Sequence, residues 1–487
     1  MKNAWPEIHS ELNRRRLERV RNTPELAISA ILRDDYMNQM PAEVVDFTSI
    51  GMRLRLREVV DIPSHLNRVQ ILLGKETLGN IKSFDLISWN AEKSELAISF
   101  PTMETTPTPR RSHRLKLRHD GLFRVQLVAD DPAFAAQKIY FSILDVHSSG
   151  LSVQTSLRNK YLFPDSPLEA CRILFPDCDN VQFQARVRNI RPMGESLRIG
   201  LEIVNPSSEL KECLGQIGLL VHDYPATDSV KEMVEKIEAA GFSRKKISKA
   251  FSVGVVSNAE DYQRVLDLRW RAYLSAGKMK AGTSPIDMSD HFDARSTIIV
   301  LRLRDRVVAT VRVVRCYGEE DRFPFEDYVS LPLSNRERLE GCELSRMAVD
   351  PGVKGTDLPS GLVQRMLEFA LRGGARMGYC VATESLQTVY KRIGWKVASG
   401  KFPHPVLENE MMSLMRVNPH DLAAAEGIPA LVWEAVYADV SHFLFDRGFT
   451  DKIPSPAMTK LRKLYEKNIM KVAKLLTKPK ALKEPGK

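Results

Sequence analysis

The chain has 487 residues, of which 43% are hydrophobic and 27% charged, so it is about three times as long as a typical domain and has an ordinary soluble composition. These values exclude a single-domain fold, a collagen-like chain and global disorder, and without a long apolar run we expect neither a membrane-spanning nor a secreted protein. The net charge of +10 lies mostly between Lys460 and Lys487, where ten Lys and Arg oppose two Glu, so the body of the chain lacks the basic surface that nucleic acid needs.

The cysteines are scattered along the chain, without a C-x-x-C pair and without a histidine at metal-ligand spacing. We therefore expect no metal site and no disulfide framework, and a reducing cytoplasm as the location. The six residues are Cys171, Cys178, Cys213, Cys316, Cys342 and Cys380.

The first half of the chain contains two similar units, each of about 100 residues. In each unit an R-x-x-x-R segment precedes a D-x-x-x-x-G segment, and the Asp and Gly of the two units are 99 positions apart. Short stretches of alternating apolar and polar residues predict antiparallel strands, so we expect two small β-barrels in tandem, over residues 10–104 and 108–222. The paired residues are Arg15, Arg19, Asp46 and Gly51 in the first unit and Arg110, Arg114, Asp145 and Gly150 in the second.

The pairing of R-x-x-x-R with a later D-x-S-x-x-G resembles the PilZ domain, a bacterial receptor for cyclic di-GMP. The resemblance implies that the eight paired residues bind the dinucleotide, because guanidinium groups grip phosphates and a carboxylate accepts hydrogen bonds from guanine. Thr48 and His147 replace the Ser of the motif. The Pro-rich segment 101–111 resembles the arm that folds over the ligand in this family, which favours the second unit. The alternative is that one or both units are structural barrels without a ligand.

Residues 223–250 contain apolar residues at helical spacing, followed by Gly241. This pattern predicts a helix with a glycine C-cap that links the first half to the second.

Residues 251–420 alternate between strand and helix patterns, which predicts an α/β domain with one mixed sheet. The order of the elements and the SLQTVYKRIGW segment around Tyr390 resemble the GCN5-related N-acyltransferase (GNAT) fold. Four ordered motifs sharpen the resemblance, to acyl-homoserine lactone synthases and to long-chain N-acyl amino acid synthases of the FeeM type. These motifs contain Arg269, then Asp290 and Asp293, then Arg312, and finally Glu343, Ser345 and Arg346.

Spacing alone also orients some of these side chains. Arg269 lies on an apolar stripe of its predicted helix, so we expect it to point inward, with Asp290 and Asp293 as candidate partners. Whether Arg269 is a structural clamp or also contacts substrate stays open. Glu343 and Arg346 have opposite strand parity, so a β-bulge between them is needed to bring both to one cleft.

The resemblance implies that an amine attacks a thioester carbonyl. It implies that Glu343 acts as, or orients, the general base, and that Tyr390 is the acid for the leaving thiolate. Arg312 or Arg346 would hold the carboxylate of an amino acid. Arg346 then belongs to the catalytic centre, and the substrate-binding residues are Arg269, Asp290, Asp293, Arg312 and Ser345. The alternatives are a surface Glu at position 343 and a core aromatic at position 390.

The donor is inferred from the segment 350–361, which lacks the glycine order of CoA-binding loops. We therefore expect an acyl carrier protein, rather than CoA, to deliver the acyl group, although a helix starting near Asp357 suits a pantetheine phosphate. A basic amphipathic helical tail, within residues 421–487, fits an acidic carrier protein or anionic lipid headgroups. A solvated helix is the alternative for this tail.

Together these features predict a cytoplasmic multidomain protein, with a tail suited to contact the inner membrane, that acylates an amino acid under the control of cyclic di-GMP. The alternatives are an acyl-homoserine lactone synthase that uses S-adenosylmethionine, and a cyclic di-GMP effector whose acyltransferase half is inactive. We expect neither a nucleic-acid partner nor a metal cofactor.

Overall fold

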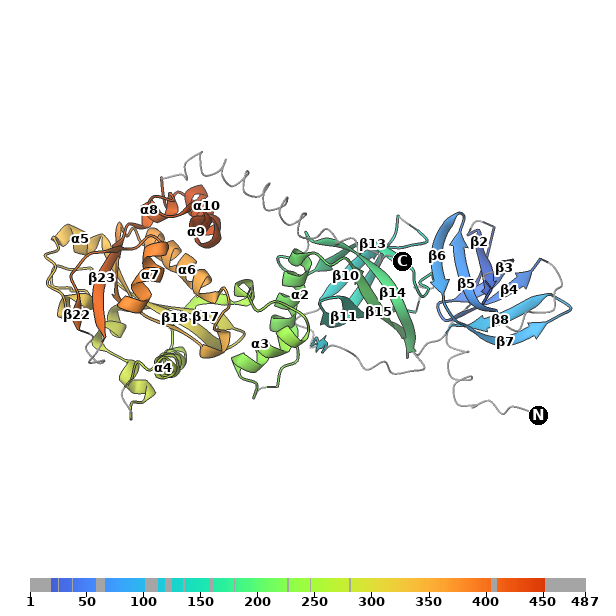
Figure 1. The fold of residues 1–487 in the computed structure, drawn as a ribbon, viewed down its shortest axis with the longest axis horizontal. Helices are drawn as coiled ribbons and strands as arrows, with labels where there is room; N and C mark the ends of the chain where they lie inside the picture. Colours follow the sequence, from blue (N-terminus) through green and yellow to red (C-terminus); the bar gives the residue numbers. More distant parts are fainter. Residues whose placement is uncertain are drawn as a thin grey trace, which may run out of the picture. The chain divides into compact units, whose positions relative to one another are not determined.

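The chain divides into two units, Met1–Ala250 and Phe251–Lys487, which are described separately (Figure 1). Arg15, Arg110, the segment 101–111 and the basic stretch 460–487 lie outside the described residues, so the predictions for them stay predictions. The computed structural model describes residues 19–24, 26–36, 38–57, 66–100, 113–118, 125–134, 136–157, 161–178, 180–225, 227–245, 247–279, 282–403 and 410–451.

The first unit begins with an antiparallel sheet in the order β6-β5-β2-β3-β4-β8-β7, with β1 paired to β3. The pairings among the described residues leave β6 and β7 at the ends, so the first of the two predicted barrels is not confirmed. Alternating hydrophobicity predicts the strands, but closure depends on which edges pair. The strands are β1 (Val20–Arg21), β2 (Ile28–Asp34), β3 (Gln39–Thr48), β4 (Gly51–Leu56), β5 (Leu66–Leu73), β6 (Glu76–Ile81), β7 (Asp85–Asn90) and β8 (Glu95–Ser99).

The second sheet of this unit is a closed antiparallel barrel, as predicted. Strand β10 pairs with both β13 and β11, which closes the order β10-β13-β14-β15-β12-β11, and β9 adds to β11. The strands are β9 (Leu115–Lys116), β10 (Gln126–Asp130), β11 (Lys138–His147), β12 (Gly150–Ser156), β13 (Pro167–Leu174), β14 (Gln182–Met193) and β15 (Ser196–Val204).

Two helices follow the barrel, α2 (Ser208–Val221) and α3 (Val230–Ala239). Helix α3 is the predicted linker helix, and Gly241 follows it with a φ of 81°, as a glycine C-cap requires. Helix α2 was not predicted. It carries Cys213, which forms a disulfide with Cys178, so the expectation of no disulfide was wrong. The two cysteines are 35 residues apart and meet only because α2 folds back onto the barrel.

The barrel completes the core of the first sheet. Phe163, between β12 and β13, is fully buried, and its ring packs against Phe47 and Phe100 of the first sheet. The backbone N–H of Asn80 in β6 donates to the carbonyl of Pro164 at 3.1 Å. The first sheet therefore depends on a residue of the barrel for part of its apolar core.

The second unit is built on one mixed sheet in the order β16-β17-β18-β19-β20-β23-β21, with β22 paired to β23. Among the described strand pairs of this unit, β19–β20 is parallel and the others are antiparallel, so the predicted α/β domain with a mixed sheet is confirmed. The strands are β16 (Ser252–Val255), β17 (Ser296–Leu303), β18 (Arg306–Val314), β19 (Gly341–Val349), β20 (Met377–Thr383), β21 (Lys396–Val397), β22 (Phe402–Pro403) and β23 (Met411–Val417).

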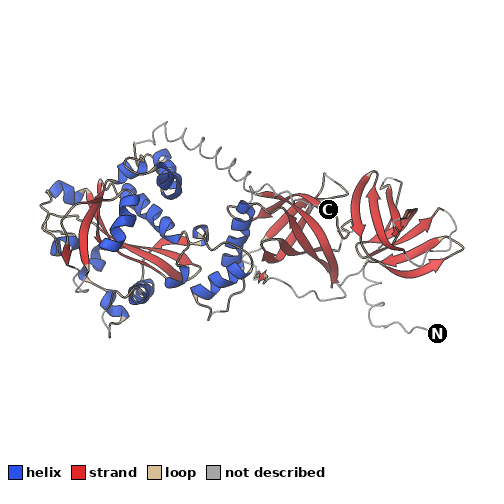
Figure 2. Ribbon diagram, in the orientation of Figure 1, coloured by secondary structure: helices blue, strands red, loops and turns tan. Residues whose placement is uncertain are grey.

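Helices cover both faces of this sheet, as the colouring by secondary structure makes visible (Figure 2). Helix α4 packs on one face through Val265 and Leu268, while α6 lines a pocket on the other. Among the described residues no helix is both long and apolar enough to cross a bilayer. The helices are α4 (Ala259–Ser275), α5 (Asn335–Leu339), α6 (Leu358–Arg372), α7 (Glu384–Arg392), α8 (Pro419–Ala423), α9 (Ala430–Val436) and α10 (Ala438–Asp446).

We predict that Phe163→Ala destabilises the first sheet by about 3–5 kcal/mol, because it removes a fully buried ring from a core that it shares with two other rings. Hydrogen–deuterium exchange of the β2 and β3 amides in the full chain measures this. Tyr140→Ala, at a position that is 58% exposed, is the control and should change protection little. Equal effects of the two substitutions would contradict a core role for Phe163.

Candidate active site

Strand β19 contains one extra residue, and this arranges the site. Its register with β18 runs from Ser345 opposite Arg312 to Ala348 opposite Thr310, so three steps on β19 match two on β18. Arg346, within this step, has a φ of 55°, which is uncommon for a residue other than glycine. A β-bulge of this kind shifts the alternation of side chains by one position, which confirms the predicted bulge.

The bulge lets consecutive residues face the same way. Ser345 and Arg346 both contact charged side chains on the face covered by α4, whereas Leu344 and Met347 line a pocket on the opposite face. In the described residues β19 pairs with β20 only at Gly341–Glu343, so the two strands diverge beyond Glu343. The divergence leaves an opening between neighbouring strands of the sheet.

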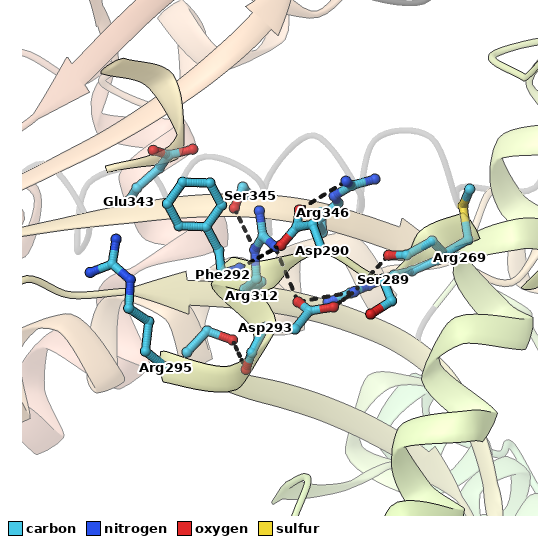
Figure 3. A network of polar contacts seen from close by, with 12 residues as sticks. Arg269, Ser289, Asp290, Phe292, Asp293, Arg295, Arg312, Glu343, Ser345 and Arg346 are labelled. Atoms are coloured by element: carbon cyan, nitrogen blue, oxygen red, sulfur yellow. Dashed lines mark hydrogen bonds and ion pairs between the residues drawn. The ribbon is translucent and has the colours of Figure 1, made fainter. Parts of the chain in front are cut away.

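The α4-covered face holds a chain of alternating charges (Figure 3). Asp293 accepts from Arg269 at 2.9 Å and from Arg312 at 3.1 Å, and Asp290 accepts from Arg312 at 2.5 Å and from Arg346 at 2.9 Å. The predicted inward direction of Arg269 and its acidic partner are therefore confirmed. We call these five residues the ion network.

The members of the ion network differ in accessibility. Arg269 is fully buried and Arg312 is 2% exposed, whereas the Arg346 side chain is 29% exposed. Ser345 accepts from Arg312 Nε at 3.0 Å, so in this structure it orients that guanidinium group. Burial acts to raise the pKa of Asp290, but Arg312 and Arg346 overcome it and hold the pKa below its usual value. Arg346 is the arginine of the network that a substrate can reach best.

Glu343 lies apart from these ion pairs, and no dashed line joins it to them in Figure 3. It is 2% exposed, and its Oε2 accepts from the backbone N–H of Phe325 at 2.9 Å. Burial raises the pKa of its carboxyl from 4.5 to about 8, against the lowering effects of the Phe325 N–H and of Arg312. A carboxyl with this pKa exchanges protons near neutral pH, as a general base must.

An apolar pocket lies on the other face of β19. Tyr390 is part of its lining, and burial raises the pKa of the Tyr390 phenol. The residues that line the pocket come from β18, β19, β20, β23, α6, α7 and α8, and from the segments that follow α7 and α9. They are Val311, Cys342, Leu344, Met347, Val363, Met366, Leu367, Ala370, Gly378, Cys380, Tyr390, Ile393, Trp395, Val417, Pro419, Leu422 and Tyr437.

In the first unit, each described arginine of the R-x-x-x-R motifs forms an ion pair with the motif aspartate of its own unit. Arg19 donates to Asp46 at 2.8 Å, and Arg114 donates to Asp145 at 2.9 Å. Sequence reasoning missed a second arginine at each aspartate, because neither arginine is part of the motif. These residues are Arg53 at Asp46 and Arg198 at Asp145.

The two motif glycines have a packing role. A Cβ atom at Gly51 would lie 2.6 Å from the carbonyl oxygen of Ile98, and one at Gly150 would lie 2.7 Å from that of Leu201. Any larger residue would therefore push the neighbouring strand away, whether or not a ligand binds.

Residues 264–418 match the family model described as "N-acyl amino acid synthase FeeM". No curated protein matches the chain. Among solved structures, the chain is similar to FeeM, an N-acyl amino acid synthase from uncultured soil microbes, at 10% identity over 39% of this chain and 97% of that one, with a TM-score of 0.29. It is similar to MesI, a CoA-dependent acyl-homoserine lactone synthase, at 18% identity over 40% and 95%, with a TM-score of 0.28.

A putative N-acetyltransferase from Lactobacillus plantarum is similar at 15% identity over 34% of this chain and 97% of that one, with a TM-score of 0.26. These structural similarities are weak, so the family match carries the assignment. It supports an N-acyltransferase in the second unit.

We predict that Asp293→Asn destabilises the second unit by about 3–5 kcal/mol, because Arg269 and Arg312 then lose their shared buried counter-charge. Arg269 is especially sensitive, since its Nε and Nη2 are buried without a hydrogen-bond partner in the described structure. The midpoint of chemical denaturation measures the effect. The control is Asp287→Asn, at an exposed capping carboxylate that bonds Ser284, where we expect about 1 kcal/mol or less. Equal losses of stability in the two variants would show that the buried charges of the network contribute no more to stability than an exposed capping carboxylate.

Proposed function

We propose that the second unit transfers a long acyl chain from the thioester of an acyl carrier protein to the amine of an amino acid, and that cyclic di-GMP bound to the first unit regulates this transfer. The observation that carries the proposal is the position of Glu343. It lies where β19 and β20 begin to diverge, with the apolar pocket on one face of β19 and the ion network on the other.

The chemistry follows from this position. The amine nitrogen attacks the thioester carbonyl carbon, Glu343 takes the proton that the nitrogen loses, and the new C–N bond replaces the C–S bond. The leaving thiolate takes a proton from the Tyr390 phenol, and the phenolate, a strong base because burial raises its pKa, takes a proton back from solvent. Backbone N–H groups of the diverging strands suit the oxyanion of the tetrahedral intermediate.

The charge of the ion network supports an acceptor with a carboxylate. Three arginines oppose two aspartates, so the network carries one net positive charge. Arg346 is the exposed member, and a guanidinium group can bind a carboxylate through two parallel hydrogen bonds. An amino acid held there by its carboxylate would present its amine toward Glu343.

The pocket supports a long acyl chain as the group transferred. Its lining is almost wholly apolar, and strands β19 and β20 both contribute to it, through Leu344 and Cys380. A chain that entered between the diverging strands would keep its thioester near Glu343 and bury its tail. For an acyl carrier protein as donor, the support is the imperfect CoA loop and the basic tail of the sequence.

Regulation by cyclic di-GMP is supported by the geometry of the barrel. Arg114 is 36% exposed beside Asp145, and the adjacent turn is tied to the linker helix, since Ser148 N–H donates to the carbonyl of Ala240 at 3.1 Å. A ligand that moved this turn would act on the end of α3. The chain enters the second unit shortly afterwards, at Phe251.

We predict that Glu343→Gln lowers kcat by about 10²–10⁴-fold, because the amide cannot accept the proton of the amine. In the wild type the rate should rise with pH and level off above about 8, where Glu343 is ionised, and the variant should lack this step. Mass spectrometry of the acylated amino acid, formed from an acyl carrier protein thioester at several pH values, measures both.

Glu340→Gln, at a half-buried acid next to the start of β19, is the matched control and should keep the wild-type profile. A wild-type protein that formed no acyl amino acid, or a Gln variant with an unchanged pH profile, would contradict the proposal.

We predict that Arg114→Ala weakens the binding of cyclic di-GMP by roughly 10- to 100-fold, the loss expected when hydrogen bonds to a charged group disappear. Isothermal titration with the full chain measures the affinity. Arg19→Ala tests whether the first sheet binds the dinucleotide, and it should change the affinity little. Arg188→Ala, elsewhere on the barrel, is the control and should also change the affinity little. Unchanged affinity in Arg114→Ala, or no binding by the wild type, would remove the regulatory part of the proposal.

A further inference from the structure

Part of the wall of the apolar pocket is built by a segment that follows the matched family region. That region ends at residue 418, yet Pro419, Leu422 and Tyr437 line the pocket. Tyr437 lies between α9 and α10 and is fully buried. Its hydroxyl donates a hydrogen bond to the carbonyl of Ile393 at 2.9 Å. The C-terminal helices therefore supply part of the pocket wall.

Strand pairing shows which part of the pocket lies next to Tyr437. Gly378 pairs with Cys342 on one side and with Val417 on the other, so three strands are held together there. A Cβ at Gly378 would lie 3.7 Å from the Trp395 ring, and Trp395 directly follows the turn that bonds Tyr437. Tyr437 is therefore linked, through the Ile393–Trp395 turn, to the part of the pocket beside Gly378, where β19 and β20 are still paired.

This wall is fixed in place. Trp433 on α9 donates from its indole N–H to the carbonyl of Leu422 at 2.9 Å, which joins α9 to the end of α8. Leu422 in turn packs close to Gly394, where a Cβ would lie 2.5 Å from its side chain. A wall with hydrogen bonds on two sides does not yield easily to a longer ligand.

We infer that Tyr437 is the end wall of the acyl pocket and determines the longest acyl chain that the protein accepts. The inference rests on the proposed function, because it takes the pocket to hold the acyl tail. An apolar site gains about fourfold in affinity for each methylene that it buries. The gain stops when the tail meets a wall that cannot move, since overpacking then costs more than burial provides.

The test measures binding apart from catalysis. Saturated fatty acids of increasing length displace a fluorescent fatty acid from the full chain, for the wild type, Tyr437→Ala and Tyr437→Phe. In the wild type, affinity should rise by about fourfold per methylene and then stop rising at one length. Tyr437→Ala should continue to gain affinity at greater lengths, whereas Tyr437→Phe keeps the ring and should stop where the wild type does. Tyr437→Leu replaces the Ala variant if circular dichroism shows that the latter is unfolded.

The outcomes separate this inference from the proposed function. If affinity for fatty acids stops rising at a greater length in Tyr437→Ala, and its acylated product also carries longer chains, both the wall and the proposed acyltransferase are supported. A longer limit for fatty acids without any product supports the wall and contradicts the acyltransferase. The same limit in all folded variants, or no binding of any fatty acid, overturns the inference.

Discussion

The site of the second unit depends on one extra residue in β19. Without the bulge at Arg346, strict alternation would send Ser345 and Arg346 to opposite faces of the sheet. With it, both contact the ion network, while Leu344 and Met347 turn to the pocket. The bulge also lies in the part of β19 that has left β20. The assignment of Ser345 and Arg346 to the ion network and of Met347 to the pocket is thus a consequence of this local irregularity.

Burial of the ion network costs desolvation free energy, and a role in packing alone would not account for it. Burying several charges requires desolvation that their mutual attraction only partly repays, so apolar residues would stabilise this sheet at least as well. The network instead fixes the position of Arg346, because Asp290 is held by Arg312, which Asp293 and Ser345 hold in turn. Charges that are fixed before a substrate arrives need not reorganise when it reacts. This arrangement is consistent with the binding role proposed for Arg346.

Sequence alone predicted the α/β domain, the strands of the first unit, the linker helix, the inward Arg269 and the bulge, because each follows from local periodicity or strand parity. Of the two predicted barrels, one is confirmed. The sequence did not predict the disulfide or Arg198 at Asp145, since these depend on elements that meet only after folding. Tyr437 was missed for the same reason: it is distant in sequence from the motifs and reaches the pocket through the packing of the last helices. Parity indicates which face a side chain takes, but not which remote segment covers that face.

The repeated motif of the first unit shows that a sequence resemblance indicates ligand binding only when the contacts of its residues have been considered. Gly51 and Gly150 are both required by the close approach of a neighbouring strand, so their recurrence reports a shared strand arrangement and carries no information about a ligand. Each motif aspartate is already held by two arginines in the absence of a ligand. A dinucleotide would therefore have to compete with a carboxylate for the guanidinium groups. A receptor differs from a structural repeat in that its arginines can leave their aspartate to bind a ligand. That freedom depends on the charges around the motif and not on the motif glycine.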